Sequence, residues 1–599
     1  MPAYVSAGVY VREIDLSLYV PALSTTIVGM VGRATKGPTN TRTYVTNQTQ
    51  FVEVFGNPDS TIGYESYAAL QYLRRGRQLW FVRIVGESAA AAEYTAQMAT
   101  EVEDETIDDT PNGVLKEFSG TLDNGAEGIV PSTITITATV GASPVTITDD
   151  GAGALAGTGV TGTITYSTGA WTLVFTTEPD DTTDILADYS YYEDAFVATM
   201  VSEGEWGNDI SIAISDGRDD DTFKITLYKD EYPIEKFDNL DLDSTSDNYI
   251  ETRINDISDY ITVDVDAGVT GTELPVNVTT PVAFTGGDSD AENVAADDIV
   301  GVAFDETLAQ PTGLQLFASP NAVDVNLLAC PGWSDSAVVV ELLAIAEARA
   351  DCMAIIDPPE SLTPAEVVDW HNGQGDYDGL HAAFSSSYGA LYWPWIKIYD
   401  AYNAQYVYAP PSGHALAAYA YTDYVGETWF APAGVRRGQV LSGIDAEYDP
   451  SRGEMDLLYG DGNAVNPIER FTKDGLVIWG QRTLQRIPTA LDRVNVRRLL
   501  LYLRKVIATA TRALVFEPND HKTWVQFGQL VTPFLNDVKQ RRGLYDFRVK
   551  CDETTNTPAV IDRNEMHAQI FLKPVKAAEF IQVDLVITAT GANFDEILY

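Results

Sequence analysis

A strand–helix–strand succession in the second half of the chain constrains its fold most. Two short apolar runs, VNLLACP at 325–331 and CMAIID at 352–357, are typical of buried strands. Asp335 stands where it can cap an amphipathic helix between them, and Thr363-Pro364 begins another helix after them. Apolar strands separated by a helix favour a βαβ unit, so this region is predicted to form a partly parallel sheet.

The first hundred residues show the same alternation of strand and helix patterns. An apolar strand is predicted over residues 26–31, and LWFVRIV at 79–85 follows a predicted helix. LQLFAS at 314–319 is predicted to be a further buried strand of the later region. The predicted fold class is therefore a multidomain α/β (α+β) protein, with a mixed-sheet α/β core built from both chain ends.

The stretch between these two regions is rich in Thr, Gly and Val. Alternating runs such as STITITATV at 132–140 and VTGTITYST at 160–168 indicate a small all-β module. The residues after it, up to about 290, are again strand-like and include a helical pattern near 248–257. We therefore expect β-rich insertion domains to interrupt the core.

These patterns divide the chain into seven predicted segments. They are an N-terminal extended arm (1–20), the N-terminal part of the core (21–98), a β-rich insertion module (99–195), a second such module (196–305), an α/β core part (306–433), a C-terminal core domain (434–579) and a C-terminal strand arm (580–599).

Charge separates the middle of the chain from its ends. The net charge is −49, yet residues 1–99 hold 8 basic and 7 acidic residues, and residues 434–599 hold 22 and 21. The excess lies in residues 100–433, with 8 basic and 59 acidic residues. Like charge is costly in protein contacts and aids solubility in water. We expect the ends to make protein contacts and the middle to face water, although adaptation of an exposed surface to a salty medium explains the same split.

Both ends carry patterns that suit inter-subunit arms. The N-terminal arm alternates weakly through Val9, Val11 and Ile14, and the C-terminal arm alternates regularly. A regular strand near a chain end can pair with its own sheet or with the edge of a neighbour. The predicted contact residues of the C-terminal arm are Ile581, Val583, Leu585 and Ile587.

Several longer stretches resemble one family. They are CDETTNTPAVIDRNE at 551–565 with ATGANFDE near the end, TWFAPAGVRRGQV at 428–440, ALDRVNVRRLLLYLRK at 490–505 and AGVYVREIDLS at 7–17. Together these are similar to the contractile-tail bacteriophage sheath proteins of the myovirus type. The resemblance covers about half the chain, from both ends, and leaves roughly 100–310 with little likeness.

The resemblance implies a structural subunit and no enzyme. Copies of such a protein stack as rings around a tail tube, are linked by arms from both chain ends, and contract to drive the tube through the host envelope for genome ejection. The implied partners are other copies of the chain, the tail tube protein, and baseplate and tail terminator proteins, without nucleic acid or membrane insertion. The implied location is the virion tail, assembled in host cytoplasm.

Two alternatives remain open at this point. Within the same class, the chain could form the sheath of a bacterial contractile injection system or tailocin. In another class, the β modules could belong to an acidic surface adhesin or hydrolase.

A basic amphipathic helix is predicted from Asp492 to about Phe516. Thr489 and Asp492 resemble a capping box, and at 100° per residue the apolar positions fall in one sector. Those positions are Val496, Leu499, Leu500, Leu503, Val506, Ile507 and Ala510. The predicted basic flank consists of Arg493, Arg497 and Arg504, and a second basic cluster, Lys539, Arg541 and Arg542, precedes Gly543.

Three interpretations of this basic surface compete: a solvated face balanced by nearby acids, a contact with the inner tail tube as the resemblance implies, and nucleic-acid binding. Little aromatic interleaving and the strongly acidic chain argue against nucleic acid. We expect the arginines and the second cluster to face the tube.

The sequence offers little for catalysis, cofactors or metals. His371 and His381 lie near three serines at 385–387, but no hydrolase, P-loop or zinc-protease motif is present. The acidic runs at 216–221 and 288–298 lack EF-hand spacing, so solvated loops are favoured over calcium sites. We therefore assign no catalytic, cofactor or metal residue.

Cysteine usage and hydropathy favour a reducing compartment without a membrane. The cysteines at 330, 352 and 551 are odd in number and have no C-x-x-C spacing, so they are predicted to be core thiols. The start of the sequence lacks the basic and apolar regions of a signal peptide, and no apolar run reaches about 18 residues.

Overall fold

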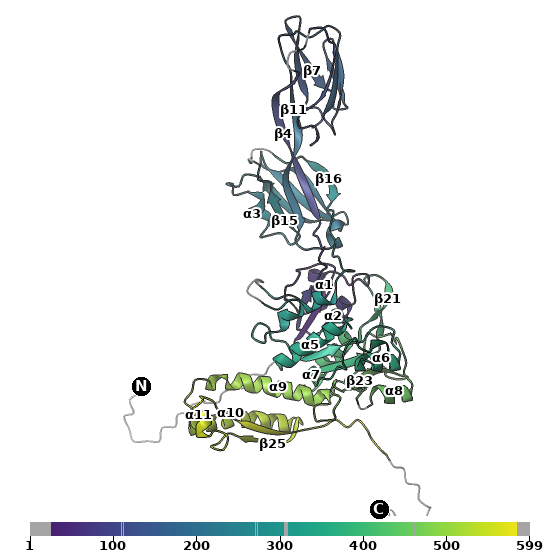
Figure 1. The fold of residues 1–599 in the computed structure, drawn as a ribbon, viewed down its shortest axis with the longest axis vertical. Coiled ribbons are helices and arrows are strands. Elements are labelled where there is room, and N and C mark those ends of the chain that lie inside the picture. Colours follow the sequence, from purple (N-terminus) through teal and green to yellow (C-terminus); the bar gives the residue numbers. More distant parts are fainter. Residues whose placement is uncertain are drawn as a thin grey trace, which may run out of the picture. The chain divides into compact units, whose positions relative to one another are not determined.

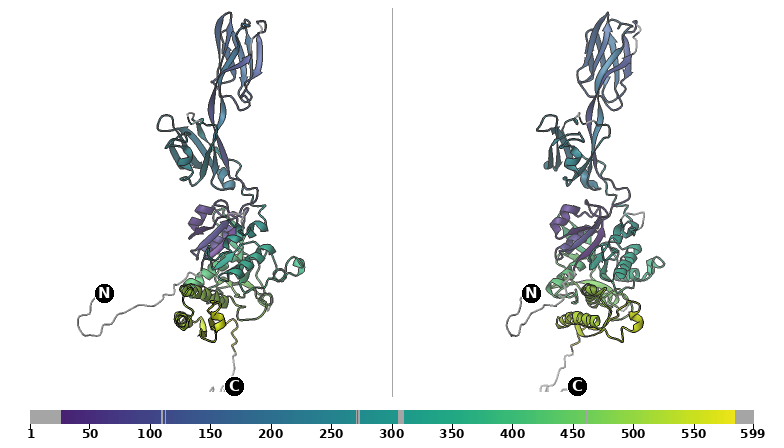
Figure 2. Two further views of the ribbon diagram at one scale, coloured as in Figure 1. Left: turned by 60° about the vertical axis from the view of Figure 1, so that its left-hand side comes forward. Right: turned by 90° about the vertical axis from the view of Figure 1, so that its left-hand side faces the viewer.

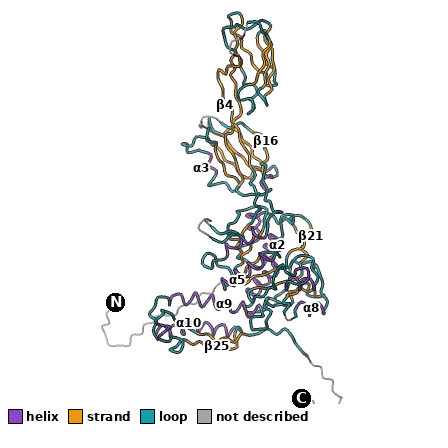
Figure 3. Tube along the Cα trace, in the orientation of Figure 1, coloured by secondary structure: helices purple, strands orange, loops and turns teal. Residues whose placement is uncertain are grey.

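The computed structural model describes residues 26–108, 111, 113–269, 271, 274–304, 310–460 and 462–583. They fall into two compact units. The core unit comprises the described residues of 1–34, 40–84 and 295–599, and the insertion unit comprises 35–39 and 85–294. The core unit mixes helices and strands, whereas the insertion unit consists mostly of strands (Figure 3).

An eight-stranded sheet forms the centre of the core unit, in the order β2-β3-β1-β17-β18-β19-β23-β24. The run from β3 to β23 is parallel, and β2 and β24 pair antiparallel at the two edges. The strands are β1 (Val28–Gly32), β2 (Thr43–Val45), β3 (Leu79–Arg83), β17 (Leu327–Ala329), β18 (Met353–Ile356), β19 (Gly389–Trp393), β23 (Val465–Phe471) and β24 (Gly475–Ile478). Strands from both ends of the chain thus share one sheet, which confirms the predicted fold class.

Helices with clear sequence signals connect these strands. Asp335 caps α5 (Ser336–Arg349), its side chain accepting a hydrogen bond from the backbone N–H of Ala337. Thr363 and Glu366 form a capping box at the start of α6 (Pro364–Asn372), as the Thr-Pro pair predicted. The other core helices are α1 (Gln48–Phe55), α2 (Glu65–Leu73), α4 (Ala296–Val300), α7 (Pro411–Val425) and α8 (Arg452–Leu458).

One predicted core strand is wrong. Residues 314–319 lie largely in a 3₁₀ helix, η2 (Gly313–Phe317), and not in a strand. Gly313 has a φ of 55°, which favours glycine and turns the chain at this point. The run is apolar because Leu314, Leu316 and Phe317 are buried, so burial was predicted correctly and the periodicity was too short to identify the element.

The C-terminal part of the core unit is a layer of two long helices and a two-stranded sheet. Helices α9 (Val494–Thr511) and α10 (His521–Gln540) lie side by side, and β25 (Leu544–Lys550) packs against α10 (Figure 1). β25 pairs antiparallel with β26 (Gln569–Pro574), and α11 (Pro558–Ile561) lies in their connection. Because β23 and β24 belong to the main sheet, residue 434 is not the start of this layer, contrary to the predicted domain at 434–579.

Beside the main sheet, β20 (Ile396–Asp400) pairs with β21 (Gln405–Ala409) and β22 (Asp445–Ala446). This small sheet contributes Ile396 and Ile398 to the same buried apolar cluster as the main sheet.

The insertion unit is built around one long antiparallel ribbon. β4 (Glu93–Asp108) and β11 (Ile185–Met200) each have 16 residues and pair along most of their length, as every view shows (Figures 1 and 2). Two separate apolar cores lie along this ribbon: Ala96 of β4 and Phe196 of β11 belong to one, and Ile185 of β11 belongs to the other.

The two insertion modules are therefore nested. The residues between β4 and β11 form one all-β module, from strands β5 (Glu117–Thr121), β6 (Thr135–Val140), β7 (Ser143–Asp149), β8 (Ala154–Gly157), β9 (Val160–Thr165) and β10 (Ala170–Phe175). The residues after β11 form the other module, from β12 (Ile210–Asp216), β13 (Phe223–Lys229), β14 (Tyr232–Leu240), α3 (Ile250–Ile254), β15 (Ile261–Val265) and β16 (Val278–Ala283). The predicted boundaries at 98/99, 195/196 and 305/306 differ from this division, because each ribbon strand serves both modules and the insertion begins near residue 85.

The predicted arms lie mostly outside the described residues, which exclude Val9, Val11, Ile14, Leu585 and Ile587. Residues 580–583 are described, and no strand is assigned to them. None of the helices in the described part of the chain is long and apolar enough to cross a membrane. Cys330 and Cys352 are buried, Cys551 is half-buried, and all three are free thiols.

Candidate functional site

Helix α9 packs against two apolar clusters, and this packing determines which of its arginines are exposed. Val494 and Leu501 belong to the buried cluster of the main sheet, whereas Leu499 and Leu503 belong to a second cluster formed with α10 and β25. The predicted apolar sector of the helix is buried or half-buried, as expected. The first turns of α9 are also buried on the opposite face, because the core sheet and its connections cover them.

The basic flank predicted on α9 is not one continuous exposed face. Arg497 is buried, its guanidinium lies over the Tyr388 ring, and burial lowers its pKa from the usual value. Arg493 is the N-cap residue of the helix and forms ion pairs within the chain. Only Arg504 of the three is exposed. Arg493 and Arg497 therefore do not form the exposed basic flank that was expected, and neither Thr489 nor Asp492 caps the helix.

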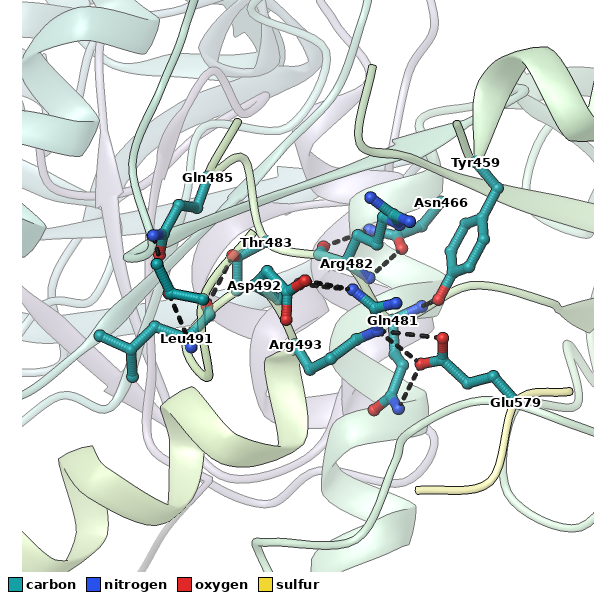
Figure 4. A network of polar contacts seen from close by, with 11 residues as sticks. Tyr459, Asn466, Gln481, Arg482, Thr483, Gln485, Leu491, Asp492, Arg493 and Glu579 are labelled. Atoms are coloured by element: carbon teal, nitrogen blue, oxygen red, sulfur yellow. Dashed lines mark hydrogen bonds and ion pairs between the residues drawn. The ribbon is translucent and has the colours of Figure 1, made fainter. Parts of the chain in front are cut away.

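Arg493 is part of a polar network that includes the C-terminal segment (Figure 4). Its Nε donates to Glu579 Oε1 at 2.8 Å and Oε2 at 3.0 Å, and its Nη1 donates to Asp492 Oδ2 at 2.8 Å. Gln481 Nε2 donates to the same Glu579 Oε1 at 2.9 Å. The Arg493 and Glu579 side chains are 16% and 17% exposed. A charged group so enclosed requires these partners.

The loop before α9 is held in place by buried polar groups. Asn466, on β23, donates to the carbonyls of Leu391 and Arg482 and accepts from the N–H of Arg482. Thr483 Oγ1 donates to the Leu491 carbonyl at 2.8 Å. These bonds close the hairpin-like loop that presents Gln481 and Arg493 to Glu579 (Figure 4).

A second ion pair attaches α9 to the core. Arg498 donates through Nη1 and Nη2 to the two carboxylate oxygens of Asp423, at 2.9 and 2.7 Å. The two side chains are only 3% and 8% exposed, and the guanidinium lies 4.7 Å from the centre of the Tyr419 ring. Such a two-bond arginine–carboxylate contact fixes orientation as well as distance.

The second basic cluster lies on the surface at the end of α10. Lys539 pairs with Asp546, and Arg541 pairs with Asp537 and Glu427, all with partly exposed side chains. Arg542 is exposed. Exposed pairs of this kind exchange partners at little cost, about 0–1 kcal/mol each.

The sheet of β25 and β26 leaves two strand edges without a partner in the described part of the chain. Among the described residues, each of these strands has only the other as a sheet partner. Tyr545 and Phe571 are 66% and 55% exposed on them. Isolated two-stranded sheets are only marginally stable and their edges are templates for further strands.

The predicted catalytic alternative finds no support in the geometry. His371 is buried with Nδ1 3.3 Å from Asn372 Oδ1, and Ser386 donates instead to Glu347. Burial lowers the pKa of His371 to about 4. His381 stacks on Phe384. These side chains therefore do not form a serine–histidine–carboxylate arrangement, and no cluster of metal-ligating side chains occurs in the described ranges.

The carboxyl edge of the parallel sheet, where ligands usually bind in such folds, is occupied by side chains of the protein. Asp357 follows β18 and accepts hydrogen bonds from the N–H groups of Ser412 at 2.7 Å and Gly332 at 3.1 Å. Burial raises the pKa of Asp357 to about 7. Beside it, Glu65 accepts from Arg33 and from the Trp333 indole. The anion position at the start of α7 is thus taken by Asp357 itself.

We expect the contribution of the buried histidines to stability to fall as the pH drops below the ordinary histidine range. His371 and His414 are buried, and burial lowers their pKa values to about 4 and about 3. Because the unfolded chain takes up protons first, near pH 6.5, each should cost about 1 kcal/mol at pH 5.5. Urea unfolding of His371→Asn at pH 7.5 and 5.5 should show a smaller pH effect than the wild type.

The exposed His521 is the matched control, and His521→Asn should keep the wild-type difference. The variants are compared at two pH values because Asp357 has the opposite effect. Its raised pKa lowers the stability of the protein as the pH rises from about 4 to 7. An unchanged pH difference in His371→Asn would contradict the buried neutral state of this histidine.

Several residues of the site were missed from the sequence. Glu579, Gln481, Asn466 and Asp423 gave no signal, because each is a single polar residue: two lie in loops, Asn466 lies on β23 and Asp423 lies near the end of α7. Their partners lie between 16 and 98 positions away in the chain, and local periodicity does not detect such pairs.

Comparisons with known proteins identify two domains in the second half of the chain. Residues 310–484 match the phage tail sheath protein central domain, and residues 488–588 match the phage tail sheath C-terminal domain. The tail sheath protein of Vibrio phage KVP40 is 34% identical over 334 residues, 52% of this chain and 47% of that protein. The tail sheath protein of Enterobacteria phage T4 is 35% identical over 295 residues, 47% of this chain and 44% of that protein.

The chain thus spans about half the length of the curated relatives it matches. Among solved structures, the crystal structure of a sheath tail protein from Desulfitobacterium hafniense has a TM-score of 0.49 and 12% identity, covering 91% of this chain and 94% of that one. Residues 310–484 and 488–588 are thus the part of the chain that is similar to phage tail sheath proteins, as their central and C-terminal domains.

Proposed function

We propose that the protein is the structural subunit of a contractile tail sheath, stacking in rings around a tail tube and contracting to drive the tube through the host envelope. The observation that carries the proposal is the C-terminal layer of the core. There, a two-stranded sheet without a third strand among the described residues is followed by a C-terminal segment that exposes Phe580, Ile581 and Val583. These two features support the proposal that one chain carries both a donor and an acceptor for inter-subunit strand pairing.

The links between copies would be strands added to open sheet edges. The outer edges of β25 and β26 would accept the arms of neighbouring copies, because main-chain hydrogen bonds and alternating side chains suit strand addition. The donors would be the N-terminal arm through Val9, Val11 and Ile14, and the C-terminal arm through Ile581, Val583, Leu585 and Ile587.

The role would be mechanical, without catalysis or a cofactor. Contraction would convert one packing of the core units into another while the strand links persist. A modest difference per subunit between two discrete packings, summed over many copies, would supply the energy. The acidic insertion unit would face water, where its charge favours solubility.

Further partners would be the tail tube, the baseplate and tail terminator proteins, and the place of action would be the virion tail after assembly in host cytoplasm. The tube contact would use those basic residues of the predicted surface that are exposed: Arg504, Lys539, Arg541 and Arg542. Exposed ionic contacts can hold a tube and still release it, because each contributes little.

Reversing charge at two of these positions should weaken assembly on the tube while the fold stays intact. Arg504→Glu with Arg542→Glu replaces two exposed cations, so stability should change by less than about 1 kcal/mol. Co-sedimentation with purified tube protein should fall several-fold, and binding of the wild type should weaken as salt rises. Arg218→Glu, on the insertion unit with a side chain 74% exposed, is the matched control. Equal binding by all three proteins would refute the tube contact.

Negative-stain microscopy of the purified protein tests the function as a whole. Regular tubular polymers are expected, because the chain carries both halves of the proposed link. A protein that stays monomeric under all assembly conditions would favour the other class of function, an acidic adhesin. Tubes alone do not separate a phage tail from a bacterial contractile injection system or tailocin, and the particle from which the protein is isolated decides between them.

A further inference from the structure

The C-terminal segment leaves the core through two fixed points. The N–H of Val575 donates to the Gly543 carbonyl at 3.1 Å, and Asn495, buried in the first turn of α9, donates through Nδ2 to the Val575 carbonyl at 3.3 Å. Four residues later, Glu579 accepts two hydrogen bonds from Arg493 and one from Gln481. The segment from Val575 to Glu579 is thus bound to the start of α9 and the loop before it, and Figure 4 shows its Glu579 end against Arg493 and Gln481.

The character of the chain changes immediately after Glu579. Phe580, Ile581 and Val583 are 83%, 82% and 72% exposed, so three large apolar side chains follow one enclosed carboxylate. The surroundings of that carboxylate are rigid: Asn466 holds the loop before α9 through three hydrogen bonds, and the Arg498–Asp423 pair holds the helix. An ion pair between two well-fixed elements loses little side-chain entropy on forming.

We infer that Arg493, Gln481 and Glu579 form a clamp that fixes the root of the C-terminal arm on its own core. The arm then reorients relative to the core only beyond Glu579, and α9 sets the direction in which it leaves. Glu579 and Arg493 are positioning residues: they act by holding the donor strand in register with its acceptor. This role in assembly rests on the proposed sheath function, whereas the clamp itself is a property of the single chain.

Hydrogen exchange of the full-length protein tests the clamp directly. In Arg493→Gln and in Glu579→Gln, residues 575–579 should exchange at least about tenfold faster than in the wild type, because a hydrogen-bonded charge loses its partner. The reporting amide is that of Val575, whose N–H donates to the Gly543 carbonyl. Amides of α9 and β26 should be unchanged, which separates loss of the clamp from general destabilisation. The exposed pair of Arg563 and Glu565 provides the control, and Arg563→Gln should leave residues 575–579 as they are.

A variant with the two charges exchanged tests whether the ion pair itself holds the segment. Arg493→Glu combined with Glu579→Arg places the new arginine opposite two carboxylates, Glu at 493 and Asp492, and should restore slow exchange at 575–579. The single variants should also form fewer or shorter tubes, and the swap should recover much of the loss. Exchange at 575–579 that is equal in the wild type and both single variants would overturn the clamp.

The clamp and the sheath function can be refuted independently of each other. If the wild type forms tubes and the variants exchange like it, the clamp is wrong and the sheath function stands. If the wild type forms no tubes, the sheath function is wrong, and the exchange of residues 575–579 still decides whether the clamp exists.

Discussion

A chain that ends at Glu579 is expected to fold normally and to lose polymerisation. Deleting residues 580–599 removes Phe580, Ile581 and Val583, which are exposed, and leaves the clamp and both sheet partners in place. The thermal unfolding midpoint should therefore shift by no more than a few degrees. The deleted residues include the whole predicted donor strand of the C-terminal arm, so tubes should be absent at concentrations where the wild type assembles completely.

Sedimentation and negative-stain microscopy of the two chains check this result. A milder variant, Ile581→Asp with Val583→Asp, should reduce assembly strongly, because two charges would enter a strand that must pair and pack. Ile257→Asp is the matched control: Ile257 is 63% exposed on the insertion unit, and the substitution should leave assembly intact. Tubes of ordinary length from the truncated chain would refute the donor role of the C-terminal arm.

The parallel core could be predicted because its signals are local. The two strands around α5 lie inside the predicted runs, and Asp335 and Thr363 cap the helices that they precede, as expected. Buried parallel strands are continuously apolar and are separated by helices with their own start signals, so each element is identified independently of its neighbours.

The nesting of the insertion modules could not be predicted in the same way. Alternation identifies a strand but not its partner, and β4 pairs with β11 although about 80 residues separate them along the chain. Because both strands run from one apolar core into the other, a division of the sequence into consecutive modules cuts each strand in two. A pairing of this range depends on the whole module between the strands having folded.

The site was misjudged where one element is covered on two sides. On an ideal helix Arg493, Arg497 and Arg504 would lie within 40° of one another, but Arg493 is the extended N-cap residue and only the other two lie in α9. Exposure was inferred from charge, yet the first turns of α9 lie between the main sheet and α10. Of the three arginines, only Arg504 lies beyond these turns and is exposed. Charge indicates exposure only where nothing covers the face, and a helical wheel does not contain that information.

Arg498→Met should destabilise the core unit by about 3 kcal/mol or more, whereas Arg504→Met on the same helix should cost less than about 0.5 kcal/mol. The difference follows from burial: the Arg498–Asp423 pair is almost completely enclosed, and Arg504 is exposed. Methionine has a similar length and good helix propensity, so both substitutions preserve the helix. Urea unfolding followed by the near-ultraviolet signal of the core tryptophans measures the difference.

The double variant Arg498→Met with Asp423→Leu separates packing from charge. Replacing a buried ion pair with apolar residues is often neutral, whereas removing one partner leaves the other charge enclosed, so the double variant should recover much of the lost stability. If Arg498→Met is as mild as Arg504→Met, the pair does not hold α9. Because α9 also carries Arg493 and Asn495, loosening it should release the C-terminal segment as well, and exchange at residues 575–579 should rise in Arg498→Met although the clamp residues are unchanged.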